Sequence, residues 1–238
     1  MRWLSAWLFF VACGDPAFPS CRHALALGLD VSGSVDAQEY QLQLDGVAAA
    51  LNSDAVSRIL FDGPAAPIKL AIFEWSGPSD QVLILPWTAL DNASARAIAT
   101  EIIVSHNRMG GSDSTAIGSA MDYGLSLLED QKECWRRTLD ISGDGETNSG
   151  PRPQDIATQD PNLIINGLVV GSGDLEAGDQ RFADIKQLSS HYRRLVIRGP
   201  GAFVETALGF EAYAAAMERK LVRELQSISL SFHEAEPQ

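Results

Sequence analysis

Short apolar runs alternate with helix-length segments along almost the whole chain, and this alternation constrains the fold more than any other feature. The runs have the length of buried strands, and the segments between them place apolar residues three or four positions apart, as on one face of a helix. Strands separated by helices of about 10–15 residues predict a mostly parallel sheet with helices on both faces. The pattern therefore favours a single α/β domain.

A Gly-Pro-Ser-Asp turn at residues 77–80 joins the second and third strands as a hairpin. The third strand should therefore be the one antiparallel strand, at an edge of a six-stranded sheet. Asp36 and Glu39 have the spacing of a capping box and predict the start of a helix. We expect strands at residues 24–31, 68–75, 82–87, 137–142, 163–170 and 194–197, and helices after Asp36 and at 93–104, 115–128, 182–188 and 211–225.

Residues 1–20 have the pattern of a secretory signal peptide and a short following segment. Arg2 precedes an apolar run at residues 3–12, which is shorter than the about 20 residues needed to span a bilayer. Two alternatives stay open: a lipobox ending in Cys13, which would be lipidated, and a buried N-terminal helix, which Pro16 and Pro19 disfavour. The pattern predicts a periplasmic or secreted bacterial protein, with a domain at residues 21–230 and a tail at 231–238.

The charge of the chain argues against two classes of partner. With 18 Lys and Arg against 31 Asp and Glu, the formal net charge is −13. Such a surface repels nucleic-acid phosphates and anionic membranes. No later segment approaches the apolar length of a transmembrane helix, and the hydrophobic fraction of 45% is sufficient for a folded core.

Oxygen-bearing side chains cluster where the strands are predicted to end. Asp30, Ser32 and Ser34 follow the first strand, Asp144 follows the fourth, and Thr115 stands at the start of a helix. Loops at the carboxyl ends of parallel strands form sites in such sheets. Two carboxylates and three hydroxyls suit a hard divalent cation that takes about six oxygen ligands, either Mg²⁺ or Mn²⁺. The alternative role of each residue is a helix cap or turn residue.

The Asp-Val-Ser-Gly-Ser run at residues 30–34, with Thr115 and Asp144 in order, resembles the metal-ion-dependent adhesion site of von Willebrand factor A domains. More narrowly, the runs at 30–43, 140–148, 165–170 and 198–203 resemble an uncharacterised bacterial family of secreted A-like proteins. The resemblance implies a three-layer, Rossmann-like fold. It further implies that Ser32, Ser34 and Thr115 ligate the metal directly, and that Asp30 and Asp144 do so directly or through water.

Four further residues are candidates for the rim of the cleft. Glu74 and Trp75 end the second strand, although core packing is the alternative for Trp75. Gly199 and Gly201 form a turn after the predicted sixth strand, and the narrower family resemblance places them at the cleft. The four histidines lack zinc-site spacing, which argues against a zinc centre.

Two cysteines, Cys21 and Cys134, remain once Cys13 is removed or lipidated. They lie nine residues before Asp30 and ten before Asp144, so at about 3.3 Å per residue they fall at nearly the same height in the sheet. If the first and fourth strands are neighbours, as in A domains, a disulfide can form in an oxidising compartment. Two buried free thiols are the alternative.

These features predict an exported, non-enzymatic, metal-dependent protein-binding module of adhesion type. A protein ligand would present an Asp or Glu carboxylate to the metal. One alternative is a Mg²⁺-dependent hydrolase, but the position two after Asp30 is Ser32 rather than a second Asp. Another is a substrate-recruiting subunit of a larger complex. The sequence names neither the ligand nor the oligomeric state.

Overall fold

The computed structural model describes residues 21–62, 66–158, 160, 162–171 and 178–233. The predicted signal peptide and Cys13 lie outside these residues, as does the end of the predicted tail after His233. Among the described helices, none has the length and apolar character required to cross a membrane.

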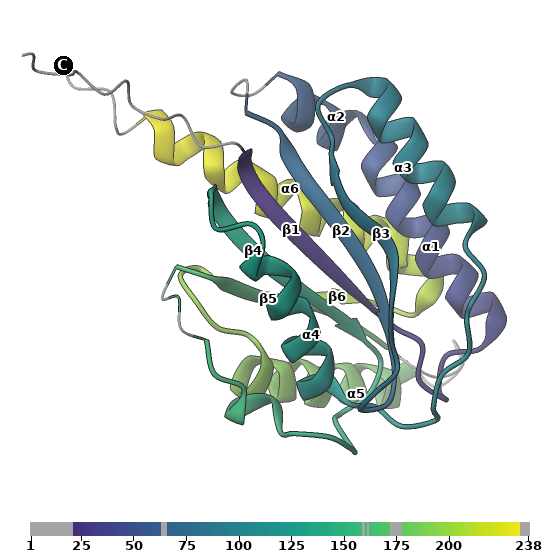
Figure 1. The fold of residues 1–238 in the computed structure, drawn as a ribbon. Helices are drawn as coiled ribbons and strands as arrows, with labels where there is room; N and C mark the ends of the chain where they lie inside the picture. Colours follow the sequence, from purple (N-terminus) through teal and green to yellow (C-terminus); the bar gives the residue numbers. More distant parts are fainter. Residues whose placement is uncertain (1–20, 63–65, 159, 161, 172–177, 234–238) are drawn as a thin grey trace, which may run out of the picture.

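Six strands form one sheet in the order β3-β2-β1-β4-β5-β6 (Figure 1). Every neighbouring pair is parallel except β2 and β3, which are antiparallel, so the predicted sheet with one antiparallel edge strand is confirmed. The strands are β1 (Cys21–Asp30), β2 (Ile68–Trp75), β3 (Gln81–Ala89), β4 (Cys134–Gly143), β5 (Ile164–Val170) and β6 (Val204–Ala207).

Helices cover both faces of the sheet. One core cluster joins the Leu25, Leu27 and Leu29 face of β1 to α1, α2, α3 and α6, and a second joins Ala24 and Ala26 to α4 and the end of α5. This division follows from the alternation of side chains along a strand that is buried on both faces. The helices are α1 (Ala37–Asn52), α2 (Asp54–Phe61), α3 (Ala93–Ser105), α4 (Ile117–Glu129), α5 (Gly178–His191) and α6 (Tyr213–His233).

Local sequence signals explain where two helices begin. Asp36 accepts a hydrogen bond from the Glu39 amide at 2.8 Å, and Glu39 accepts one from the Asp36 amide at 2.9 Å, so the predicted capping box starts α1. Helix α2 has no counterpart among the helices predicted from the sequence. Its N-cap is Ser53, whose hydroxyl accepts from the Val56 amide at 3.3 Å.

The predicted strand at residues 194–197 is wrong. The chain there forms a five-residue π-helix, Tyr192–Val196, and the Ile197 amide donates to the Tyr192 carbonyl at 3.0 Å. The sixth strand lies further on, at β6. Periodicity does not separate a short buried strand from a short buried helix, and the apolar run here is too brief to carry any other signal.

The disulfide between Cys21 and Cys134 is present in the structure. The two residues face each other across the parallel pair β1 and β4, with their Cα atoms 4.7 Å apart. The prediction from their distances to Asp30 and Asp144 is therefore confirmed. The bridge joins residues 113 positions apart at the amino-terminal ends of two central strands.

Replacing both cysteines by serine should lower the free energy of unfolding by about 4–5 kcal/mol, because the unfolded chain regains the freedom of a loop of more than a hundred residues. Urea unfolding of the oxidised protein and the double Ser variant measures the difference, with the reduced wild type as control. Free thiols at both positions in the unreduced, exported protein would contradict the bridge.

Candidate metal centre

The pairing of β1 with β4 brings the two predicted aspartates together. Leu29 lies opposite Ser142 in the parallel register, so Asp30 ends β1 beside Gly143, and Asp144 is the next residue of the neighbouring chain segment. The Val31–Val35 segment, which carries Ser32 and Ser34, leaves the sheet at the same edge. Residues 110 positions apart in the sequence therefore share one site.

Hydrogen bonds connect the two carboxylates through the serines. The Ser32 amide donates to Asp30 Oδ1 at 2.7 Å, and the Ser34 hydroxyl donates to Asp144 Oδ1 at 2.7 Å. The hydroxyl oxygens of Ser32 and Ser34 are 3.3 Å apart. The second oxygens of both carboxylates, Asp30 Oδ2 and Asp144 Oδ2, are buried without a hydrogen-bond partner among the described residues.

Burial disfavours the ionised form of both carboxylates when no cation is present. Asp30 and Asp144 are 1% and 7% exposed. Burial raises the pKa of Asp30 to about 7, with a further contribution from the nearby Asp144 and partial compensation by hydrogen bonds from Ser32. Burial also raises the pKa of Asp144, and the Ser34 hydrogen bond opposes this shift. A divalent cation between them would reverse both effects.

Thr115 faces the loop that carries Asp144. Its amide donates to Asn148 Oδ1 at 2.8 Å, and its carbonyl accepts from the Asn148 amide at 2.9 Å. Its Oγ1 lies 3.7 Å from the position that a Cβ on Gly145 would occupy. Asn148 thus positions Thr115, a role that the sequence analysis missed.

Helix capping does not account for these residues. The N-cap of α1 is Asp36, and the N-cap of α4 is Ala116, which has no side-chain capping bond. Asp30 accepts from a turn amide, and Ser34 donates to Asp144. Helix capping, one of the alternative roles considered for these candidates, therefore does not explain their convergence at this edge, and Asp30 has a turn bond besides.

Glu74, predicted at the rim of the cleft, is a buried residue that lines a cavity of about 150 Å³ with Val31 and Met109. It is 1% exposed, accepts from the Tyr40 hydroxyl at 2.8 Å and accepts from the Met109 amide at 3.2 Å. The Arg108 guanidinium donates to the carbonyls of Val35, at 2.9 Å, and Val31. Glu74 and Arg108 therefore hold the segment before Thr115 against the Asp30 loop. Neither contact has a signal in the sequence.

Trp75, Gly199 and Gly201 are not rim residues. Trp75 is fully buried in the core, in agreement with the alternative considered for it. A Cβ on Gly199 would lie 2.2 Å from the Leu163 carbonyl oxygen, and Gly201 lines a cavity with Ile164. Both glycines thus lie at the amino-terminal end of β5, opposite to the edge with Asp144. Their predicted place at the cleft is wrong, because the turn leads into β6 rather than following it.

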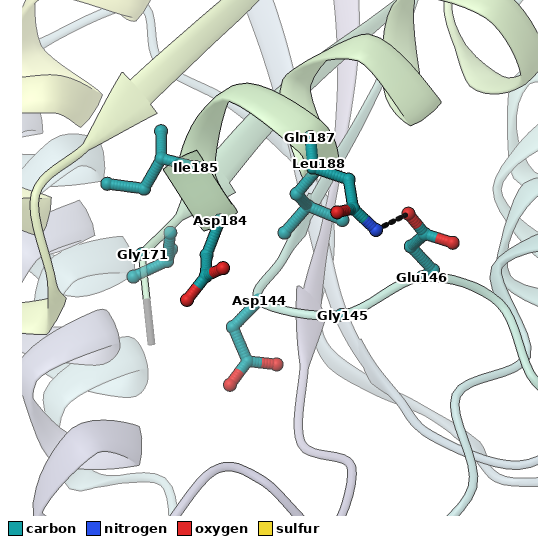
Figure 2. A pocket seen from close by; sticks show the side chains of 9 residues that line it. Asp144, Gly145, Glu146, Gly171, Asp184, Ile185, Gln187 and Leu188 are labelled. Carbon is teal, nitrogen blue, oxygen red and sulfur yellow. Dashed lines mark hydrogen bonds between the residues drawn. The ribbon is translucent and has the colours of Figure 1, made fainter. Parts of the chain in front are cut away.

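A cavity of about 220 Å³ opens beside Asp144 (Figure 2). The Gln187 side chain on α5 donates to Glu146 Oε1 at 3.2 Å across its edge. The cavity is lined both by apolar residues and by the carboxylates of Asp144, Glu146 and Asp184. The lining residues are Asp144, Gly145, Glu146, Val170, Gly171, Asp184, Ile185, Gln187 and Leu188.

The donor set fits a hard cation. Among the described residues, no three His, Cys, Asp or Glu side chains cluster as a metal site. A cation at Asp30 and Asp144 would therefore draw its other protein ligands from hydroxyls. Such an all-oxygen set suits Mg²⁺ or Mn²⁺ better than Zn²⁺. The two unpartnered carboxylate oxygens are the groups that a metal would satisfy.

Solved structures of similar fold identify the class. Proximal thread matrix protein 1 from the mussel byssus, in a structure described with a zinc-occupied MIDAS motif, matches with a TM-score of 0.57 and 16% identity over 86% of this chain and 46% of that chain. A von Willebrand factor type A protein from Catenulispora acidiphila gives 0.55 and 12% over 88% and 43%. The pilus adhesin SpaC from Lactobacillus rhamnosus GG gives 0.55 and 11% over 89% and 31%.

The fold is thus that of a von Willebrand factor A domain, as the sequence motif predicted. The chain spans about half the length of proximal thread matrix protein 1 and less of the adhesin. Residues 20–229 match the family described as "Protein of unknown function (DUF1194)", and the chain belongs to that family. None of the curated proteins matches this sequence.

Mg²⁺ should raise the thermal stability of the domain, because a cation that binds only the folded state stabilises it by mass action. At about a hundred times the dissociation constant, we expect a rise in melting temperature of about 5–10 °C. Asp144→Ala should abolish most of this rise, whereas Asp122→Ala, at an exposed position on α4, should keep it. Equal responses of the wild type and Asp144→Ala would refute the site.

The metal-free protein should lose stability as the pH rises from about 4 to about 7. The folded-state pKa of Asp30, about 7, is above its ordinary value of 3.8, so its contribution is present at low pH and is lost as the carboxyl ionises. Asp30→Asn, which keeps the acceptor for the Ser32 amide, should reduce the slope. Urea unfolding at several pH values in EDTA measures it. An unchanged slope in Asp30→Asn would contradict this assignment.

Proposed function

We propose that this chain is an exported, Mg²⁺-dependent protein-binding module of adhesion type. The metal is held by Asp30, Ser32, Ser34, Thr115 and Asp144, with Mn²⁺ as a functional substitute. A partner protein supplies an Asp or Glu carboxylate as a further ligand. The observation that carries this proposal is the pair of buried, unpartnered oxygens, Asp30 Oδ2 and Asp144 Oδ2, at the carboxyl edge of the sheet.

The composition of the donor set supports a carboxylate as the external ligand. Three of the five side chains are neutral hydroxyls, so the protein contributes about as much negative charge as the cation carries positive charge. A hard cation with few charged ligands still attracts an anionic oxygen, and Mg²⁺ takes about six ligands in all. The cavity beside Asp144 leaves space at this edge for the residues around such a carboxylate.

Two observations support export. The disulfide between Cys21 and Cys134 is of the kind that persists in the periplasm or outside the cell. Residues 1–20 carry the signal-peptide pattern, and in the lipobox alternative Cys13 would become the anchor of a lipoprotein.

Three of the four lysines have roles that argue against the phosphohydrolase alternative, and the fourth, Lys186, is exposed on α5. Those enzymes use a lysine near the phosphate, but Lys69 pairs with Glu133 at 3.0 Å and Lys132 with Glu129 at 2.6 Å. Lys220 is fully buried against Asp140. Magnesium-dependent phosphatase turnover that Asp30→Ala abolishes would instead establish an enzyme.

A cross-linking pull-down from a periplasmic fraction tests the binding function, with mature protein as bait in Mg²⁺ and in EDTA. We expect a partner that is captured only with the metal, is captured equally by Asp122→Ala, and is lost with Asp144→Ala. Amidation of the partner's carboxylates should also abolish capture. Capture that survives both EDTA and amidation would rule out metal-bridged recognition. A partner that proves to be a multi-subunit enzyme would favour the substrate-recruiting alternative.

A further inference from the structure

Tyr192 is a wholly buried residue at the junction of α5 and the π-helix that follows. Its ring crosses two strands of the sheet at positions occupied by glycine. A Cβ on Gly167 in β5 would lie 2.6 Å from Tyr192 Cδ1, and a Cβ on Gly143 in β4 would lie 2.6 Å from its hydroxyl oxygen. A larger residue at either position would displace the ring. The two glycines therefore create the space that holds this phenol beneath the metal loops.

The hydroxyl of Tyr192 reaches the unpartnered side of Asp30. The same Cβ position on Gly143 lies 2.9 Å from Asp30 Oδ2. The Tyr192 hydroxyl oxygen and Asp30 Oδ2 thus lie 2.6 and 2.9 Å from the same Cβ position. Their separation is therefore no larger than the distance that a single water molecule can bridge. Within the described part of the chain, neither oxygen has a hydrogen-bond partner.

The Tyr192 hydroxyl is a buried polar group for which packing alone gives no role. Leaving such a group without a hydrogen bond destabilises the fold, and a phenylalanine would fill the same groove without that cost. A phenol keeps its proton at neutral pH and can therefore serve as a donor. The hydroxyl thus lies within water-bridging distance of a carboxylate oxygen that has no donor among the described residues.

We propose that Tyr192 is a positioning residue of the metal centre: its hydroxyl donates to Asp30 Oδ2 through one buried water and orients the carboxylate toward the cation. The inference rests on the metal site proposed above. Each carboxylate oxygen has two lone pairs, so Asp30 can accept from both Ser32 and the bridging water and still face a metal or its water. Outer partners of this kind fix the geometry of metal ligands.

The π-helix accounts for the placement of this side chain. A π-turn widens the helix by one residue, and such turns often occur at functional sites. Here the Ile197 amide bonds back to the Tyr192 carbonyl at 3.0 Å, five residues earlier. Tyr192 therefore enters the groove over Gly143 and Gly167 at the point where the helix changes its winding.

Tyr192→Phe tests the proposal, because it removes only the hydroxyl and keeps the ring. Calorimetric titration with MnCl₂ should show about tenfold weaker binding than in the wild type. The electron paramagnetic resonance spectrum of the bound Mn²⁺ at saturation should also change, because Asp30 loses its orientation. The matched control is Tyr213→Phe. Tyr213 is also fully buried, but its hydroxyl bonds to Ser142 Oγ at 3.1 Å.

Tyr213→Phe should lower the melting temperature of the metal-free protein and leave the Mn²⁺ affinity and spectrum unchanged. If Tyr192→Phe binds Mn²⁺ like the wild type, or if both variants weaken binding equally, Tyr192 is only a packing residue and the inference fails alone. If the wild type binds neither Mn²⁺ nor Mg²⁺, the metal-dependent function fails and the inference fails with it.

Discussion

Parallel pairing of β1 with β4 at the centre of the sheet is the interaction on which the other features depend. Its register opposes Cys21 to Cys134 and Leu29 to Ser142. The amino-terminal ends of the two strands are therefore joined by a disulfide. At their carboxyl ends, Asp30 and Asp144 lie close together. A slip of one residue would turn the side chains of a strand to the opposite face and would separate both pairs. Burial on both faces makes such a slip costly, because each face of β1 fills a separate core cluster.

That pairing creates an electrostatic problem at the carboxyl edge. Two carboxylates are withdrawn from water next to each other, and both the loss of hydration and their mutual repulsion favour protonation. Hydrogen bonds from Ser32 and Ser34 satisfy one oxygen of each group. The other two oxygens are buried, and a proton, a cation or a donor such as Tyr192 is needed to balance them. The stability of the fold and the proposed binding of a metal would therefore depend on the same two carboxylates.

The sequence predicted those parts of the site that are local. Asp30, Ser32 and Ser34 stand in one turn after an apolar run, and the cysteine positions required only counting. The rest depends on contacts that no local pattern records: Arg108 reaches Val35 across 73 residues, and Asn148 holds Thr115 across 33. The error at residues 194–197 has a similar origin, since a buried π-turn and a buried strand show the same short apolar run. That error also misplaced Gly199 and Gly201. A turn that follows a parallel strand lies at the carboxyl edge of the sheet, whereas the turn with these glycines precedes β6 and lies at the amino edge.

The position of the disulfide has a mechanical consequence. Cys21 is the first residue of β1, so any tension applied through the preceding segment enters the fold at that residue. Without a cross-link, this load would act on the end of a single strand. The bridge to Cys134 transmits it at once to β4, and both strands lie in the interior of the sheet. Pulling along two covalently joined central strands loads many backbone hydrogen bonds in shear rather than one after another. If a partner binds at the opposite edge, near Asp144, tension between the partner and the preceding segment would thus meet high mechanical resistance to unfolding.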